Sequence, residues 1–130
     1  MMNLAVRTLT LAVAVSLGTA AFAQGMVPAK TAETAKGKAF VDDQGMTLYT
    51  FDKDTAGKSA CNGPCAAAWP PMMASATATA TGEWTVVTRD DGSKQWAYKA
   101  KPLYTYAKDS KAGDISGDGF LNGAWHIATP

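Results

Sequence analysis

The chain carries the heptapeptide Leu-Tyr-Thr-Phe-Asp-Lys-Asp at residues 48–54 and the related Leu-Tyr-Thr-Tyr-Ala-Lys-Asp at residues 103–109. Each copy is followed by a glycine-containing stretch and then by the pair Ala-Trp, at residues 68–69 and 124–125. The first offset is 55 residues and the second is 56, so one inserted residue reconciles them. Such a duplication is typical of two copies of one supersecondary unit that share a core.

We therefore expect a single domain over residues 38–130 that contains two tandem repeats. The first repeat is expected at 38–73 and the second at 83–130. The low-complexity segment Ala-Ser-Ala-Thr-Ala-Thr-Ala-Thr-Gly at 74–82 predicts a linker between them. Residues 24–37 have almost no large apolar side chain, which predicts a flexible leader.

The N-terminal residues predict export. A short segment with one positive charge precedes the apolar residues 9–19, and Ala-Phe-Ala at 21–23 fits a cleavage site. These features are typical of a signal peptide over residues 1–23, so we expect a periplasmic or secreted protein. The apolar segment is too short for a transmembrane helix, and no cysteine directly follows it, so neither a transmembrane segment nor a lipid anchor is predicted.

Composition narrows the class of partner. The 130 residues include 12 basic and 11 acidic side chains, and the lysines are spread along the chain. Nucleic-acid binding requires a clustered basic excess, so no nucleic-acid partner is expected. The length suits one domain.

Turn signals predict an all-β fold with short antiparallel strands and long glycine-rich loops. We expect hairpins over residues 40–51 and 84–98, a strand over 103–106, a helical turn over 66–69 and a final strand over 125–128. In each repeat strand, two aromatic residues are two positions apart and share one face. We expect these rings to form the core that the repeats share, the alternative being an exposed aromatic surface for a ligand. The rings are those of Tyr49, Phe51, Trp69, Tyr104, Tyr106 and Trp125.

Two carboxylates and two cysteines occupy notable positions. Asp54 and Asp109 end the two motif copies. We expect each to cap its loop by accepting backbone N–H bonds, the alternative being a catalytic carboxylate pair. Cys61 and Cys65 are expected to form a structural disulfide in an oxidising compartment, worth about 2 kcal/mol for so short a loop.

Metal sites are weakly indicated. His126 is the only histidine, and with Met72 and Met73 it is a candidate set for copper. Asp114 and Asp118 fall in a loop whose spacing is similar to a calcium loop, but position 12 holds tryptophan instead of glutamate. We therefore expect no metal and no cofactor, and keep these five residues as candidates.

The pattern Tyr-x-aromatic-x-x-Asp, present at 49–54 and 104–109, resembles the bacterial "secreted repeat of unknown function" family, also described as predicted lipoproteins with a Yx(F/W/Y)xxD motif. The resemblance extends through residues 61–71 and covers about 38–130. It implies an exported bacterial protein built from tandem repeats. It implies no activity, because the family has none assigned.

Three hypotheses about function follow. The favoured one is an exported, non-enzymatic binding or interaction module, because no convergent catalytic set is present. Its partner would be an unidentified protein or small ligand, held in the loop over 114–122 or against exposed aromatic rings. The alternative is a metal-binding or redox-linked periplasmic accessory protein that uses His126, the methionines or the cysteine pair. The third is a hydrolase that uses Asp54 and Asp109.

Overall fold

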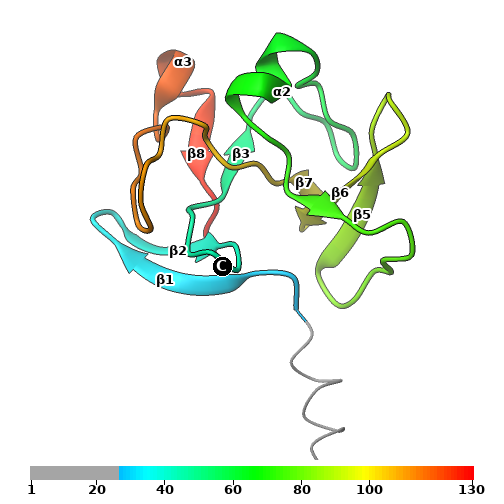
Figure 1. Ribbon diagram of the computed structural model, residues 1–130, viewed down its shortest axis with the longest axis horizontal. Coiled ribbons are helices and arrows are strands. Elements are labelled where there is room, and N and C mark those ends of the chain that lie inside the picture. The colour runs from blue at the N-terminus through cyan, green and yellow to red at the C-terminus, as the bar shows by residue number, and fades with distance from the viewer. Residues whose placement is uncertain (1–26) are drawn as a thin grey trace, which may run out of the picture.

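The computed structural model describes residues 27–130, which contain eight short strands and two short helices (Figure 1). The predicted signal peptide lies outside the described residues. All the strand pairs are antiparallel, and the predicted all-β class is confirmed. Neither helix is long and apolar enough to cross a membrane. In chain order, the elements are β1 (Lys30–Thr34), β2 (Gly37–Val41), β3 (Tyr49–Phe51), α2 (Pro64–Ala68), β4 (Met73–Ala74), β5 (Trp84–Thr88), β6 (Lys94–Tyr98), β7 (Lys101–Pro102), α3 (Phe120–Gly123) and β8 (Trp125–Ile127).

The expected flexible leader over residues 24–37 is wrong for its last part. Strand β1 pairs with β2 in register from Lys30 opposite Val41 to Thr34 opposite Gly37. Gly37 has a φ of 103°, which the tight turn between the strands requires. Backbone hydrogen bonds hold β1 in place, and these bonds need no large apolar side chain. The polar composition of this segment therefore hid a strand.

The first predicted hairpin forms only in part. Its turn is present, since the Asp42 N–H donates to the Met46 carbonyl at 2.9 Å and Val41 bridges Thr47. Beyond that bridge the chain leaves β2, and β3 pairs instead with β8, which places Tyr49 opposite Ile127. The first motif copy and the last strand are thereby joined in one small sheet.

The expected strand over residues 103–106 is also wrong as a continuous element. Only Lys101–Pro102 pairs with β6, and Tyr104 forms isolated bridges to both Tyr49 and Pro71. Leu103 and Thr105 direct their N–H groups to the carbonyls of Trp96 and Pro70, respectively. The segment thus crosses several neighbours at single points, so no ladder develops along it.

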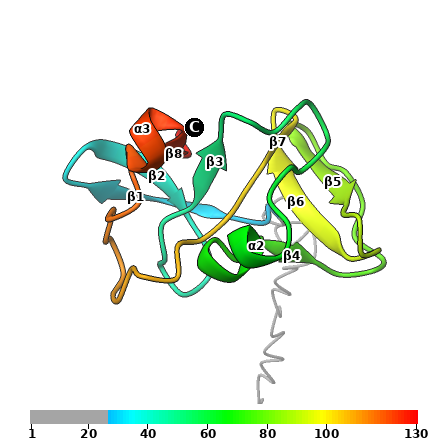
Figure 2. The same cartoon turned by 90° about the horizontal axis from the view of Figure 1, so that it is seen from above.

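Three other expectations about local structure hold, whereas the linker expected over 74–82 is wrong at Ala74, which ends β4 and pairs with Lys94. The hairpin over 84–98 is confirmed by β5 and β6, which pair from Trp84 opposite Tyr98 to Thr88 opposite Lys94. The helical turn appears as α2 and the final strand as β8. Residues 75–83 form neither helix nor strand. The β5–β6 hairpin and the α3–β8 segment lie at opposite ends of the molecule, as Figures 1 and 2 both show.

Two clusters of buried side chains fill the interior. Leu48 and Leu103 pack with Phe40 and Trp84 in one cluster, whereas the adjacent Tyr49 and Tyr104 belong to the other. Successive side chains of an extended segment point to opposite faces, so each motif copy supplies both clusters. The duplication therefore builds two cores from one short sequence.

A column of four stacked rings forms most of the second cluster. The ring centroids of Trp69 and Trp125 are 3.7 Å apart and the planes are 3° from parallel. Phe51 stacks outside Trp125 at 4.1 Å, and Tyr106 stacks outside Trp69 at 4.0 Å. Each repeat thus contributes one central tryptophan and one outer ring. Five of the six motif aromatics are buried in this core, and Phe51, at one end of the column, is half-buried.

Gly117 lies directly against this column. A Cβ atom at this position would lie 2.5 Å from the Trp69 ring, closer than side-chain carbons approach in proteins. The loop that the sequence suggested as a ligand site is thus packed on the core at this residue.

We expect Trp69→Ala and Trp125→Ala each to lower the free energy of unfolding by about 3–5 kcal/mol, because each leaves a cavity among buried rings. The two tryptophans are only 3% and 1% exposed. Urea denaturation measures the effect. Phe120→Ala is the control, since this ring is 47% exposed and its loss should cost far less. Equal costs for all three variants would contradict the role of the column.

Candidate functional site

The two motif aspartates exchange hydrogen bonds with the tyrosines of the opposite repeat. The Tyr49 hydroxyl donates to Asp109 Oδ2 at 2.6 Å, and the Tyr104 hydroxyl donates to Asp54 Oδ2 at 2.7 Å. The same tyrosines pair through their backbones, with N···O distances of 2.7 and 3.0 Å. Each tyrosine–aspartate hydrogen bond thus has an equivalent in which the two repeats trade the roles of donor and acceptor.

The second oxygen of each aspartate closes its own loop. Asp54 Oδ1 accepts the N–H of Ala60 at 2.7 Å, and Asp109 Oδ1 accepts the N–H of Ser116 at 3.0 Å. Both carboxylates are thus tied to loop amides, as loop capping requires. The hydrolase hypothesis needs carboxylates available to a substrate, and this geometry does not provide them.

Burial changes the acidity of the groups in this exchange. Burial raises the pKa of the Asp54 carboxyl, although the Ala60 N–H, the Tyr104 hydroxyl and the Arg89 charge oppose this effect. Burial likewise raises the pKa of the Tyr49 and Tyr104 hydroxyls. Both tyrosines therefore remain neutral donors at ordinary pH.

An additional polar network beside Asp54 joins residues of both repeats. Arg89 is buried, and its guanidinium donates to Gln95 Oε1 at 2.7 Å and to Ser59 Oγ at 3.0 Å. It also donates to the carbonyl of Cys61, whose predicted disulfide with Cys65 is confirmed. Sequence reasoning missed Arg89, because nothing in its local sequence distinguishes it from a solvated turn residue.

The candidate copper ligands lie apart from one another. Met72 and Met73 line a cavity with Asp42 and Asp43, whereas His126 lines a different cavity. His126 Nε2 is 2.9 Å from Asp52 Oδ2. Within residues 27–130, no group of three or more His, Cys, Asp or Glu side chains is placed to hold a metal ion.

The candidate calcium ligands have structural partners. Asp114 accepts the N–H groups of Ser110 and Lys111, and these bonds lower the pKa of its carboxyl. Asp118 accepts the N–H of Ile127, and its ion pair with Lys36 lowers the pKa of its carboxyl. Both side chains therefore organise the loop that contains them.

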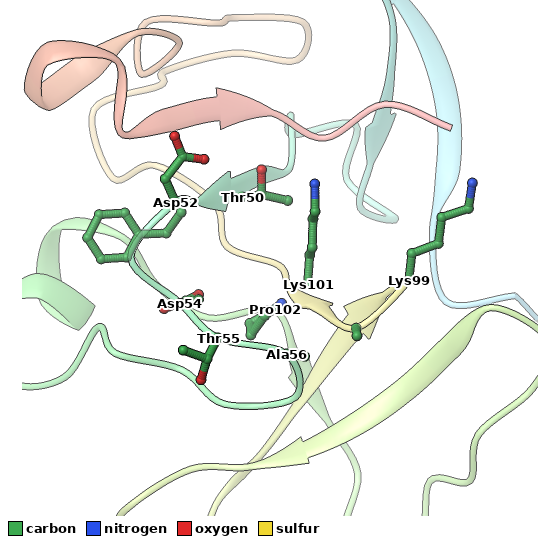
Figure 3. A pocket seen from close by; sticks show the side chains of 10 residues that line it. Thr50, Asp52, Asp54, Thr55, Ala56, Lys99, Lys101 and Pro102 are labelled. Atoms are coloured by element: carbon green, nitrogen blue, oxygen red, sulfur yellow. The ribbon is translucent and has the colours of Figure 1, made fainter.

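A polar groove runs between β3, β7 and β8. It consists of two adjoining cavities of about 240 and 340 Å³ that share four lining residues. The shared residues are Thr50, Asp52, Lys99 and Lys101. Figure 3 shows both lysines projecting to the same side of the β6–β7 turn, with Asp52 beyond Thr50 on the opposite wall. We define these two cavities together as the lysine groove.

An unusual turn presents the two lysines. Tyr98 pairs with Lys101, so Lys99 and Ala100 alone connect β6 to β7. Their φ angles are 50° and 68°, in the left-handed region that glycine and asparagine occupy more readily. The Ala100 carbonyl accepts the N–H of Gly57 at 3.0 Å, which ties the turn to the opposite loop.

The sequence analysis did not identify this groove. Its walls come from three segments that are distant in the chain, so no local motif encodes it. The sequence contains one indication of this groove: Lys99-Ala100 occupies a two-residue hairpin turn, where Asn-Gly is favoured.

Comparison with known proteins identifies one family. Residues 30–73 and 85–129 each match the model of a family described as a secreted repeat of unknown function. The first match begins at β1, eight residues before the expected start of the first repeat. No curated protein and no solved structure matches the chain.

We expect Tyr49→Phe to lower the free energy of unfolding by about 1–3 kcal/mol, because Asp109 Oδ2 loses its donor in a buried site. Tyr98→Phe is the matched control, at a half-buried ring outside the exchange. Chemical denaturation of the two variants checks the difference. A Tyr49→Phe variant as stable as Tyr98→Phe would show that the exchange contributes nothing.

Asp54 should make stability fall as the pH rises. Its raised pKa means that the folded chain binds more protons than the unfolded chain between the ordinary aspartate pKa and the folded value. This contribution is complete below the unfolded pKa and is lost as the pH rises through the folded pKa. We expect the free energy of unfolding of the wild type, minus that of Asp54→Asn, to decrease across this window.

Asp114→Asn is the control for this pH dependence, because the pKa of Asp114 is lowered and its sign is opposite. The wild type minus Asp114→Asn difference should grow as the pH rises from below the folded pKa of Asp114 to the ordinary aspartate value. Denaturant titrations at a series of pH values measure both differences. Two differences with the same sign would refute the assignment for Asp54.

Proposed function

The chain belongs to the family of secreted repeats of unknown function, and on that premise we propose that it is an exported, non-catalytic binding protein. The secreted description of the family supports export, and residues 1–23 would act as the signal peptide. The binding site in this proposal is the lysine groove.

One contrast carries the proposal. Asp54, Asp109 and Arg89 all make hydrogen bonds that maintain the fold. In the lysine groove, by comparison, Lys99 and Lys101 form no ion pair within residues 27–130. Polar groups that the fold does not use are available to a ligand, and they converge on a concave surface.

The shape of the groove supports a small ligand. Its larger cavity, of about 340 Å³, falls at the lower end of the range for small-molecule sites. Ionic groups and apolar side chains both line it, since Leu103, Ile127 and Ala128 lie beside the lysines. Such a lining can fix the orientation of a ligand while also burying part of its apolar surface.

We expect small organic molecules of mixed charge to bind in the lysine groove before any other cavity. The measurement is a two-dimensional ¹H–¹⁵N NMR screen of the exported protein, with neutral, anionic and cationic fragments as probes. Shifts should concentrate on the amides of Thr50, Asp52 and residues 99–101. Fragments that shift only the amides around Met72 and Met73, or no fragment that binds at all, would refute the proposal.

Thr50→Tyr provides the blocking variant, because a ring at this position occupies the groove. Thr105→Tyr is its matched control, since Thr105 holds the equivalent place in the second repeat and lines the cavity near Met72. Fragment binding should disappear in the first variant and persist in the second. Persistence in both folded variants would place the binding site elsewhere.

A further inference from the structure

We propose that the lysine groove binds an organic anion with a short apolar body, whose charged end lies between Lys99 and Lys101. This inference rests on the proposed function, because it names the ligand class of the same site. Three features of the groove carry it: the excess of lysine over carboxylate in its larger cavity, the strained turn that presents the lysines, and its apolar floor.

The first feature is the charge balance. Lys99 and Lys101 are both exposed and two residues apart, and Figure 3 shows their amino groups on the same side of the turn. In the larger cavity these two lysines face one carboxylate, that of Asp52, which lies 2.9 Å from His126 Nε2, and Asp54 lines only the smaller cavity. Lys99 Nζ also lies 5.5 Å from the centroid of the Tyr98 ring, which lines the same cavity. An anion in this cavity would be attracted by both ammonium groups.

The second feature is the backbone that presents the lysines. Lys99 and Ala100 both have left-handed φ angles, which non-glycine residues adopt only at a cost in energy. The turn would form more easily with Asn-Gly, so turn formation does not account for a lysine at position 99. The strained turn holds Lys99 at the rim of the groove, and the backbone N–H of Lys99 donates to the backbone carbonyl of Glu83 at 2.9 Å.

The third feature is the floor of the groove. Tyr98 and Ile127 are half-buried and supply the apolar surface that lines the larger cavity, where Leu103 is fully buried. An inorganic anion would leave this apolar surface in contact with water, whereas a short hydrocarbon body would cover it. The hydroxyl groups of Thr50 and Thr129 line the same cavity and can donate to an anionic oxygen.

The test compares four probes of defined charge: hexanoate, the neutral isostere hexanamide, the cation hexylamine, and inorganic phosphate. Each is titrated into the exported, ¹⁵N-labelled protein at low salt, and the shifts of the groove amides give its dissociation constant. We expect hexanoate to bind at least about tenfold more tightly than hexanamide, hexylamine or phosphate. Added salt should weaken hexanoate binding but leave hexanamide binding nearly unchanged.

Variants then assign the preference to the two lysines. The pair Lys99→Met and Lys101→Met should weaken hexanoate binding about tenfold and bring it level with hexanamide. The pair Lys108→Met and Lys111→Met removes the same charge from exposed positions outside the groove, and it should change neither constant by more than about twofold. The pair Lys99→Arg and Lys101→Arg retains both charges and should retain the preference for the anion.

The outcomes separate the two proposals. If hexanamide or hexylamine binds the groove as tightly as hexanoate, the site stands and the anion preference is overturned. If phosphate alone matches hexanoate, the apolar body is overturned. If no probe shifts the groove amides, whereas fragments of other classes do, only the ligand class fails. If nothing binds the groove, the proposed function fails as well.

Discussion

The exchange of hydroxyl–carboxylate hydrogen bonds between the two repeats is the contact on which the rest of the structure depends. The Tyr49 hydroxyl donates to Asp109 and the Tyr104 hydroxyl donates to Asp54, so each repeat supplies a donor to the aspartate that closes a loop of the other. The backbone bridge between the same tyrosines fixes the register of the exchange. With that register set, the leucines before the tyrosines fall into one core and the tyrosine rings into the other. The stacked column of four rings follows from the same alternation.

This constraint also explains where a ligand site can form. The polar residues of the duplicated motif are used to hold the repeats together, and the glycine-rich loop of the second repeat packs on the column through Gly117. Next to β3 and β8, the turn between β6 and β7 carries side chains that take no part in that exchange. There the side chains of Lys99 and Lys101 line a groove without serving either core. The two lysines of the proposed binding site thus belong to neither core, although Phe51, Asp54 and Leu103, which also line the groove, contribute to the fold.

The sequence predicted the parts of the fold that local chemistry controls. The turn residues predicted the β5–β6 hairpin, and the two-residue spacing predicted that the aromatic rings share one face. The oxidising compartment expected for an exported protein predicted the disulfide between Cys61 and Cys65. It failed where pairing partners decide the outcome. Strand β1 has a polar sequence, so no hydrophobic pattern marks it, although its backbone pairs fully with β2. Strand β3 pairs with the distant β8 and not with β2, the strand that precedes it in the chain. The capping role of Asp54 followed from its residue type, but its tyrosine partner did not, because the two lie 50 residues apart. The lysine groove was not predicted for the same reason, because its lining residues come from segments that are distant in the chain.

The reciprocal hydrogen bonds between the repeats also imply that the smallest stable unit of this fold contains two repeats. In an isolated repeat, the tyrosine hydroxyl and the aspartate carboxylate of the motif would both lack the partners that the other repeat supplies. A second copy of the same repeat could supply both. A lone repeat would therefore pair with another chain as a two-fold dimer. The segment over residues 75–83, which forms neither helix nor strand, is what makes that pairing intramolecular here. By the same reasoning, a third repeat added to this chain would offer a tyrosine hydroxyl and a carboxylate that have no counterpart within it.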